Sequence, residues 1–271
     1  GEPEAAAAAA PPPLGSGGHP RTTVPAPHEI YAVGGQFCDW HGAAGDPADT
    51  VERFSSAAGR WEPLAAPGVG ATHAAAAAAG GLVYVFGGLS SGRALSQAHC
   101  LDPVRRKWEA LKPMPTPRFE CAAACAGRRL YVLGGASGTG DPLAVAECYD
   151  PSAGKWRPGV PSMSCARFGC AAASHGGRVF VLGGRNLHQS LDIVECFDPS
   201  AGQWALLPPM PTPRQRCGAA EVAGCIYVLG GSDGGQDLSS VDRFDPAAGT
   251  WEASAPMLQP CGRCSAAAVS S

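Results

Sequence analysis

The chain has 271 residues, a net charge of −3 at neutral pH and 16% charged residues. This sparse, balanced charge provides no basic surface for nucleic acid or for a membrane, and no stretch approaches the roughly 18 apolar residues of a membrane span. The 37 glycines and 26 prolines favour many turns over long helices.

The first segment, residues 1–27, is predicted to be a disordered Ala/Pro-rich tail, and residues 28–271 are predicted to be one folded domain. Six consecutive alanines and then three prolines lie in the tail. Such a segment has little apolar surface to offset the entropy lost on ordering. It also lacks the basic start and leucine-rich core of a secretory signal.

Five short apolar runs in the folded domain each end in a Gly-Gly doublet, and a tryptophan follows each doublet. The runs span residues 30–33, 83–86, 130–133, 179–182 and 226–229. The tryptophans are Trp61, Trp108, Trp156, Trp204 and Trp251. They lie 47, 48, 48 and 47 residues apart. A fixed period of about 40–50 residues is typical of a repeat architecture.

The third repeat predicts four antiparallel strands. A segment of small residues, 121–126, is followed by a turn and by the apolar run 130–133, which has the length and composition of a strand covered on both faces. A polar loop leads to a third strand at 145–149, and Trp156 begins the fourth. Between them, Asp150 starts an Asp-Pro-Ser-Ala-Gly turn of favourable composition. Four strands per repeat are typical of a β-propeller blade.

The alanine run 74–79 favours a helix by propensity alone. However, it begins thirteen residues before its Gly-Gly doublet, as Cys121 does in the next repeat. This shared register predicts a strand. Small side chains suit the innermost strand, where blades converge on the axis of the ring.

The Gly-Gly doublet, the Tyr/Phe-Asp-Pro turn and the spaced tryptophan together resemble the kelch repeat, over roughly residues 28–269. The turns lie at 149–151, 197–199 and 244–246, and those at 101–103 and 54–56 depart from the pattern. The resemblance implies an all-β propeller of four-stranded antiparallel blades, with five repeats here.

Ring closure is expected through pairing of the C-terminal first strand, residues 263–269, with the N-terminal blade. Such pairing removes exposed strand edges and holds the termini together. Kelch propellers more often resemble rings of six or seven blades, so a larger ring is the alternative.

Twelve cysteines are predicted to be free thiols. Several occupy the same position in successive repeats, so they point in parallel directions, whereas a disulfide needs Cα atoms within about 7 Å. Free thiols favour a cytoplasmic location. The isolated Cys261-x-x-Cys264 has no second pair, and no metal, cofactor or catalytic residue is predicted.

The loops after the Gly-Gly doublets differ most between repeats, and variable loops on a rigid scaffold usually carry binding. In the first loop, Trp40 is either a packing residue or an aromatic anchor for a partner. Arg185 and Asn186, which begin the fourth loop, are also candidate contact residues.

Five arginines are expected on the same face: Arg118, Arg167, Arg214, Arg216 and Arg263. The first three stand sixteen residues before a doublet, and the other two lie beside that position. In kelch domains of ubiquitin-ligase adaptors, arginines in matching loops resemble groups that bind acidic peptides, because guanidinium groups bind carboxylates bidentately. The alternative is a structural role, with pairing to Glu147, Glu195 and Asp242.

The sequence therefore predicts a non-enzymatic module that binds a protein or acidic peptide through its loop face. The resemblance implies substrate recognition for a cullin-type ubiquitin ligase, which needs a BTB-like region not found in these 271 residues. Two other classes remain open, an actin-associated scaffold and a propeller-type enzyme acting on a sugar or small molecule.

Overall fold

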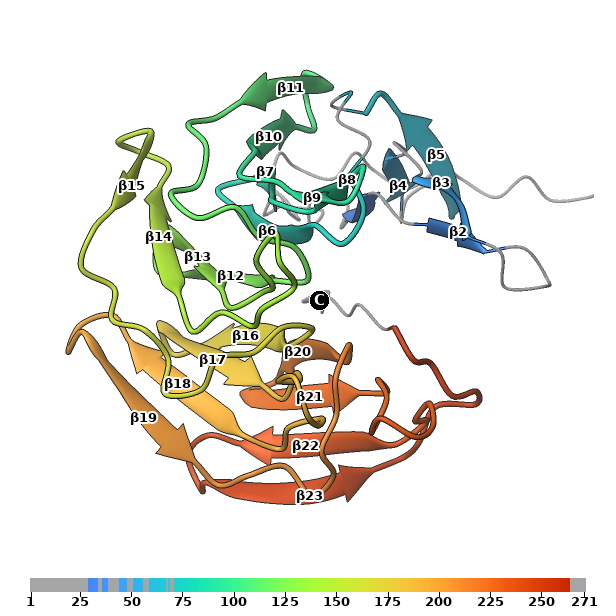
Figure 1. Ribbon diagram of the computed structural model, residues 1–271, viewed down its shortest axis with the longest axis vertical. Helices are drawn as coiled ribbons and strands as arrows, with labels where there is room; N and C mark the ends of the chain where they lie inside the picture. The colour runs from blue at the N-terminus through green and yellow to red at the C-terminus, as the bar shows by residue number, and fades with distance from the viewer. Residues whose placement is uncertain are drawn as a thin grey trace, which may run out of the picture.

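A computed structural model describes residues 29–33, 36–38, 44–47, 51–55, 59–66, 68 and 71–263. Strands and turns make up these residues, and the sheets stand around a central space (Figure 1). The tail 1–27 and the C-terminal segment expected to close the ring, from residue 264 on, lie outside the described residues.

We call the sheets of three or four strands blades 1 to 5 in chain order. Blade 1 contains β1 (Glu29–Val33), β4 (Val51–Ser55) and β5 (Arg60–Leu64). Blade 2 contains β6 (Ala75–Ala79), β7 (Leu82–Phe86), β10 (Ala98–Asp102) and β11 (Lys107–Ala110). Blade 3 contains β12 (Ala122–Ala126), β13 (Arg129–Leu133), β14 (Ala146–Asp150) and β15 (Lys155–Arg157).

Blade 4 contains β16 (Ala171–His175), β17 (Arg178–Leu182), β18 (Val194–Asp198) and β19 (Gln203–Leu207). Blade 5 contains β20 (Gly218–Val222), β21 (Cys225–Leu229), β22 (Val241–Asp245) and β23 (Thr250–Ser254). All pairings within blades are antiparallel, which confirms the predicted four-stranded repeats in blades 2 to 5.

The innermost strands are β6, β12, β16 and β20, as the small residues predicted (Figure 1). Each begins with small side chains, and these line a central channel of about 190 Å³ that includes Ala75, Ala122, Ala171 and Gly218. The alanine run of blade 2 is therefore a strand. Pairing with β7 and the channel position override its helix propensity.

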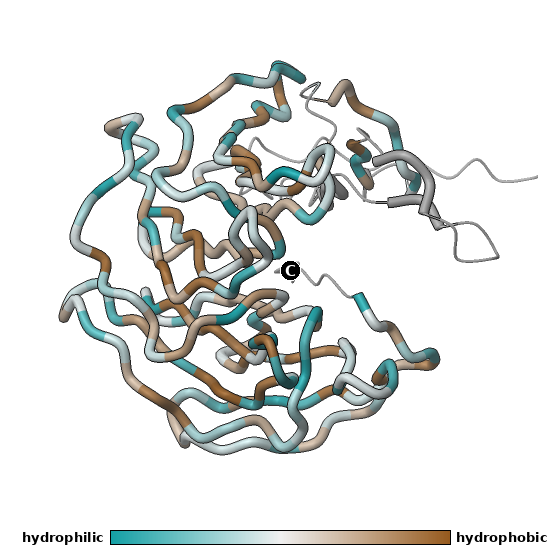
Figure 2. Tube along the Cα trace, in the orientation of Figure 1, coloured by the Kyte–Doolittle hydropathy of each residue, from teal (hydrophilic) through white to brown (hydrophobic). Residues whose placement is uncertain are grey.

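The apolar core lies between neighbouring blades. Tyr131 and Leu133 of blade 3 are buried in one cluster with Val179 and Val181 of blade 4, and Trp204 packs against that cluster. Figure 2 shows hydrophobic residues concentrated along the middle strands and hydrophilic ones at the turns. Because each blade covers its neighbour, the middle strands are apolar on both faces.

The turn after the third strand forms as predicted. In blade 3, an Asp150 side-chain oxygen accepts hydrogen bonds from the Ser152 hydroxyl (2.6 Å) and the Ala153 N–H (3.1 Å). Gly154 adopts a φ of 60°, a left-handed conformation that glycine adopts without strain. Bonds from the Ser152 hydroxyl and the Arg157 guanidinium hold the pKa of Asp150 well below its usual range.

Cys100, Cys121, Cys148, Cys170 and Cys196 are free and buried, as expected. Burial raises the pKa of Cys121 to about 12 and that of Cys170 to about 11. These thiols are therefore protonated and pack as small apolar side chains.

Two features differ from the sequence expectation. The loop 36–49 contains a short hairpin, β2 (Gln36–Cys38) with β3 (Ala44–Pro47), and a second hairpin, β8 (Leu89–Ser90) with β9 (Arg93–Ala94), lies in the next loop. Blade 5 also differs from its neighbours, because Tyr227 and Leu229 are partly exposed whereas the equivalent Tyr131 and Leu133 are buried.

Candidate functional site

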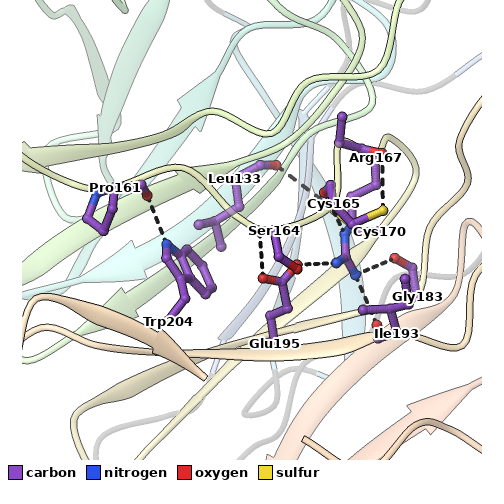
Figure 3. Close-up of polar contacts among 11 residues, drawn as sticks. Leu133, Pro161, Ser164, Cys165, Arg167, Cys170, Gly183, Ile193, Glu195 and Trp204 are labelled. Carbon is purple, nitrogen blue, oxygen red and sulfur yellow. Dashed lines mark hydrogen bonds and ion pairs between the residues drawn. The ribbon is translucent and has the colours of Figure 1, made fainter. Parts of the chain in front are cut away.

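Arg167 lies just before the innermost strand of blade 4, and its side chain is fully buried. Figure 3 shows its polar contacts. Its Nη1 donates to the carbonyls of Gly183 (3.2 Å) and Ile193 (2.9 Å). Its Nη2 pairs with the carboxylate of Glu195, which also accepts a hydrogen bond from the Ser164 N–H (2.8 Å). The guanidinium thus fastens the Gly-Gly loop of blade 4 to its third strand.

Arg118 and Arg214 make the same contacts one repeat away on either side. Each is fully buried, and each donates to the first glycine carbonyl of its doublet, Gly134 or Gly230. They pair with Glu147 and Asp242 respectively. The expected partner contact for Arg118, Arg167 and Arg214 is therefore wrong, because no guanidinium surface faces solvent. The structural alternative, with these three acidic partners, is observed.

A ring of backbone contacts surrounds one mouth of the central channel. His73, Glu120, Gly169 and Arg216 each lie two residues before an innermost strand, and each has a φ between 49° and 60°. The N–H of Glu120 donates to the His73 carbonyl (2.9 Å), that of Gly169 to Glu120 (2.8 Å), and that of Arg216 to Gly169 (2.6 Å). These hydrogen bonds connect four successive blades and fix the backbone position of each of the four residues.

The side chains of this ring form a polar cluster over a cavity of about 150 Å³, lined also by Arg263. Arg216 Nη2 lies 2.8 Å from a Glu120 oxygen, although the two residues belong to blades 5 and 3. They meet across Gly169, where a Cβ atom would lie 3.3 Å from both side chains. The absent side chain of blade 4 thus makes the pair possible.

The electrostatics of the mouth favour an anion. Burial lowers the pKa of His73, Glu120 opposes this, and Arg263 and Arg216 lower it further, so the imidazole is neutral at pH 7. Glu120 balances Arg216. Arg263 is exposed and forms no ion pair with a residue that the structure describes. One positive charge is therefore left at the mouth.

Of the residues expected to bind, the structure brings Arg216 and Arg263 together at the mouth. His73 and Glu120 belong to the same cluster and were not among those residues. They were detectable, because each directly precedes the small-residue segment of its repeat, as Arg216 does. A comparison of repeats at that one position would have found them.

The remaining expected residues lie elsewhere. Arg185 extends over the ring of Phe168 at 5.5 Å and remains partly exposed. Asn186 shapes its own loop, because its Oδ1 accepts the N–H groups of His188 and Gln189, both at 2.9 Å. Trp40 lies outside the described residues.

Within the described ranges, no group of three or more histidine, cysteine or acidic side chains is arranged to hold a metal ion. The same residues include no helix long and apolar enough to cross a membrane.

The chain is similar to known proteins by family, by sequence and by fold. Residues 18–210 and 72–271 match the family described as the KLHDC2/KLHL20/DRC7 Kelch-repeats domain. An F-box/kelch-repeat protein of Arabidopsis thaliana is 36% identical over 74 residues, which are 27% of this chain and 19% of that protein. The chain therefore matches about a fifth of the length of this curated relative. The structure of YjhT is similar in fold, with a TM-score of 0.60 and 20% identity over 70% of this chain and 67% of that one.

Proposed function

Since this chain belongs to the kelch-repeat family, whose domains generally bind protein partners, we propose that it is a non-enzymatic module that binds an acidic peptide segment of a partner at the channel mouth. The uncompensated charge of Arg263 beside the Arg216–Glu120 pair is the observation that carries this proposal. A carboxylate of the partner would supply the missing counter-charge, in bidentate geometry on a guanidinium group.

The backbone ring supports this assignment because it preorganises the site. Three hydrogen bonds of 2.6–2.9 Å fix the main chain from which His73, Glu120 and Arg216 project. Little ordering is then needed when a partner binds, and ordering costs are a main reason why interfaces bind weakly. The small volume at the mouth suits one acidic side chain rather than a folded domain.

A peptide-display selection tests the proposal. The folded chain should enrich peptides with one or more Asp or Glu, and Arg263→Ala and Arg216→Ala should each weaken binding of a selected peptide about tenfold or more. Arg128→Ala is the matched control, because this exposed arginine lies in the turn between β12 and β13 at the opposite end of the innermost strand. Equal binding by all three variants, or no enrichment of acidic residues, would contradict the proposal.

The biological setting that we propose is substrate recognition for a ubiquitin ligase in the cytoplasm. Its support is the resemblance to an F-box/kelch-repeat protein. Co-purification of ligase subunits with the intact gene product tests this setting separately from peptide binding.

A further inference from the structure

A second pocket lies on the same face, between the Gly-Gly loops of blades 4 and 5. Its volume is about 520 Å³, and its lining includes Arg185, Asp192, Gln215 and Asp233. The two loops are held by their own side chains, because Asp233 Oδ1 accepts the N–H groups of Gly235 (2.7 Å) and Gln236 (2.8 Å), as Asn186 does in the other loop. The pocket walls are therefore fixed before any ligand binds.

Gln215 is the unusual residue of this pocket. Only 7% of it is exposed, and its Oε1 accepts no hydrogen bond from any residue that the structure describes. A buried acceptor without a donor costs about 1–3 kcal/mol. Such a residue is expected where a ligand supplies the missing donor.

The neighbouring repeats show that the fold does not need an amide here. Gln215 pairs with Ser232 in an isolated bridge, and the equivalent bridges use Phe119 with Ala136 and Phe168 with Arg185. Thr72, the equivalent residue of blade 2, is polar, but its hydroxyl donates to the Leu89 carbonyl at 3.3 Å. Gln215 alone of these four residues has a buried polar atom left unpaired.

The other polar groups define the ligand chemistry. Arg185 offers guanidinium donors and forms no ion pair with a described residue, while Asp192 and Asp233 are acceptors on the pocket wall. A carboxylate would suit Arg185 but would face two like charges and give Gln215 no donor. An ammonium group would suit the acceptors but would face Arg185. A neutral group with both a donor and an acceptor satisfies both requirements.

We propose that this pocket binds a primary carboxamide, the side chain of a glutamine or asparagine, with its N–H donating to Gln215 Oε1 and its carbonyl accepting from Arg185. The carboxamide would belong to the segment that the channel mouth binds, because Gln215 directly precedes Arg216. The inference rests on the proposed function only in that last step.

Titration with a small probe tests the pocket independently of the mouth. N-acetyl-glutamine methylamide should produce saturable chemical-shift changes in the loops 185–192 and 232–238, with a Kd on the order of 1–10 mM for a ligand of this size. The glutamate and norleucine analogues should bind at least tenfold more weakly. Absence of saturation, or equal binding of glutamate, would overturn the proposal, whereas failure of acidic peptides at the mouth would leave this result unaffected.

Two variants and one control complete the test. Gln215→Phe installs the residue of blades 3 and 4, so it should fold with an equal or higher Tm while losing the probe. Arg185→Met should weaken binding of the probe about tenfold. This second variant tests the proposal if Gln215→Phe does not fold. Gln203→Ala, an exposed glutamine of β19, should bind as the wild type does. Probe binding retained by a folded Gln215→Phe, or by Arg185→Met, would refute the assignment.

Discussion

Each nitrogen of the Arg167 guanidinium has a hydrogen-bond or ion-pair partner within the protein. The guanidinium is bonded to blade 4, and the main-chain carbonyl of Arg167 accepts the N–H of Gly135 from blade 3 at 2.9 Å. The residue therefore links two blades. A buried ion pair is not a strong source of stability by itself, but the loss of one partner leaves an uncompensated buried charge.

Arg167→Met should therefore lower the free energy of unfolding by about 3–5 kcal/mol in urea denaturation, because Glu195 is left buried and unpaired. The double variant Arg167→Met/Glu195→Met should recover part of this loss. Arg185→Met, which breaks no ion pair, should change stability by about 0.5 kcal/mol or less. A similar small effect for Arg167→Met would show that the guanidinium is hydrated rather than buried.

At the scale of the strand and its turn, the sequence predicts well wherever a repeat constrains each position. The strands of blades 2 to 5, the Asp150 turn and the channel position of the alanine run were all inferred correctly, since equivalent residues recur five times. The burial of Arg118, Arg167 and Arg214 could not be decided, because an arginine that binds a partner and one that binds its own loop look the same in sequence. Contact between Glu120 and Arg216 depends on ring geometry, which places residues 96 positions apart together.

Gly134 and Gly127 each follow the end of a strand, but glycine is needed at the two positions for different reasons. Their φ angles are alike, 59° and 62°, but a Cβ on Gly134 would lie 2.6 Å from the Arg167 carbonyl, whereas one on Gly127 would meet nothing within 4 Å. Gly127→Ala should cost about 1–2 kcal/mol from the left-handed backbone. Gly134→Ala should cost roughly 1–3 kcal/mol more, because it also displaces the neighbouring blade. Equal losses of stability for the two variants in thermal unfolding would contradict the close approach of Gly134 to the Arg167 carbonyl.

At the scale of the whole molecule, hydrogen bonds from the tryptophan indoles connect neighbouring blades. The indole N–H of Trp156 donates to the Lys112 carbonyl at 2.9 Å, and those of Trp204 and Trp251 donate to Pro161 and Pro208 at 2.8 and 2.9 Å. Each bond reaches the segment that follows the preceding blade. Trp61 of blade 1 is instead 48% exposed. Trp108 of blade 2 bonds in the same way to the Ala65 carbonyl at 2.6 Å. The same indole position is thus an interblade contact in blades 2 to 5 and a surface residue in blade 1.

Phenylalanine substitutions at these positions should therefore differ. Trp156→Phe leaves the Lys112 carbonyl without its donor and should cost about 1–2 kcal/mol, whereas Trp61→Phe should cost about 0.5 kcal/mol or less. Trp61→Phe should also reduce the fluorescence that iodide quenches, because Trp61 is 48% exposed whereas the indoles bonded between blades are less accessible. If Trp61→Phe instead costs as much as Trp156→Phe and leaves quenching unchanged, the indole of Trp61 is packed against another blade in solution. Blade 5 would then be its expected neighbour, since the partly exposed Tyr227 and Leu229 occupy the positions that Phe197 and Trp204 cover on blade 3.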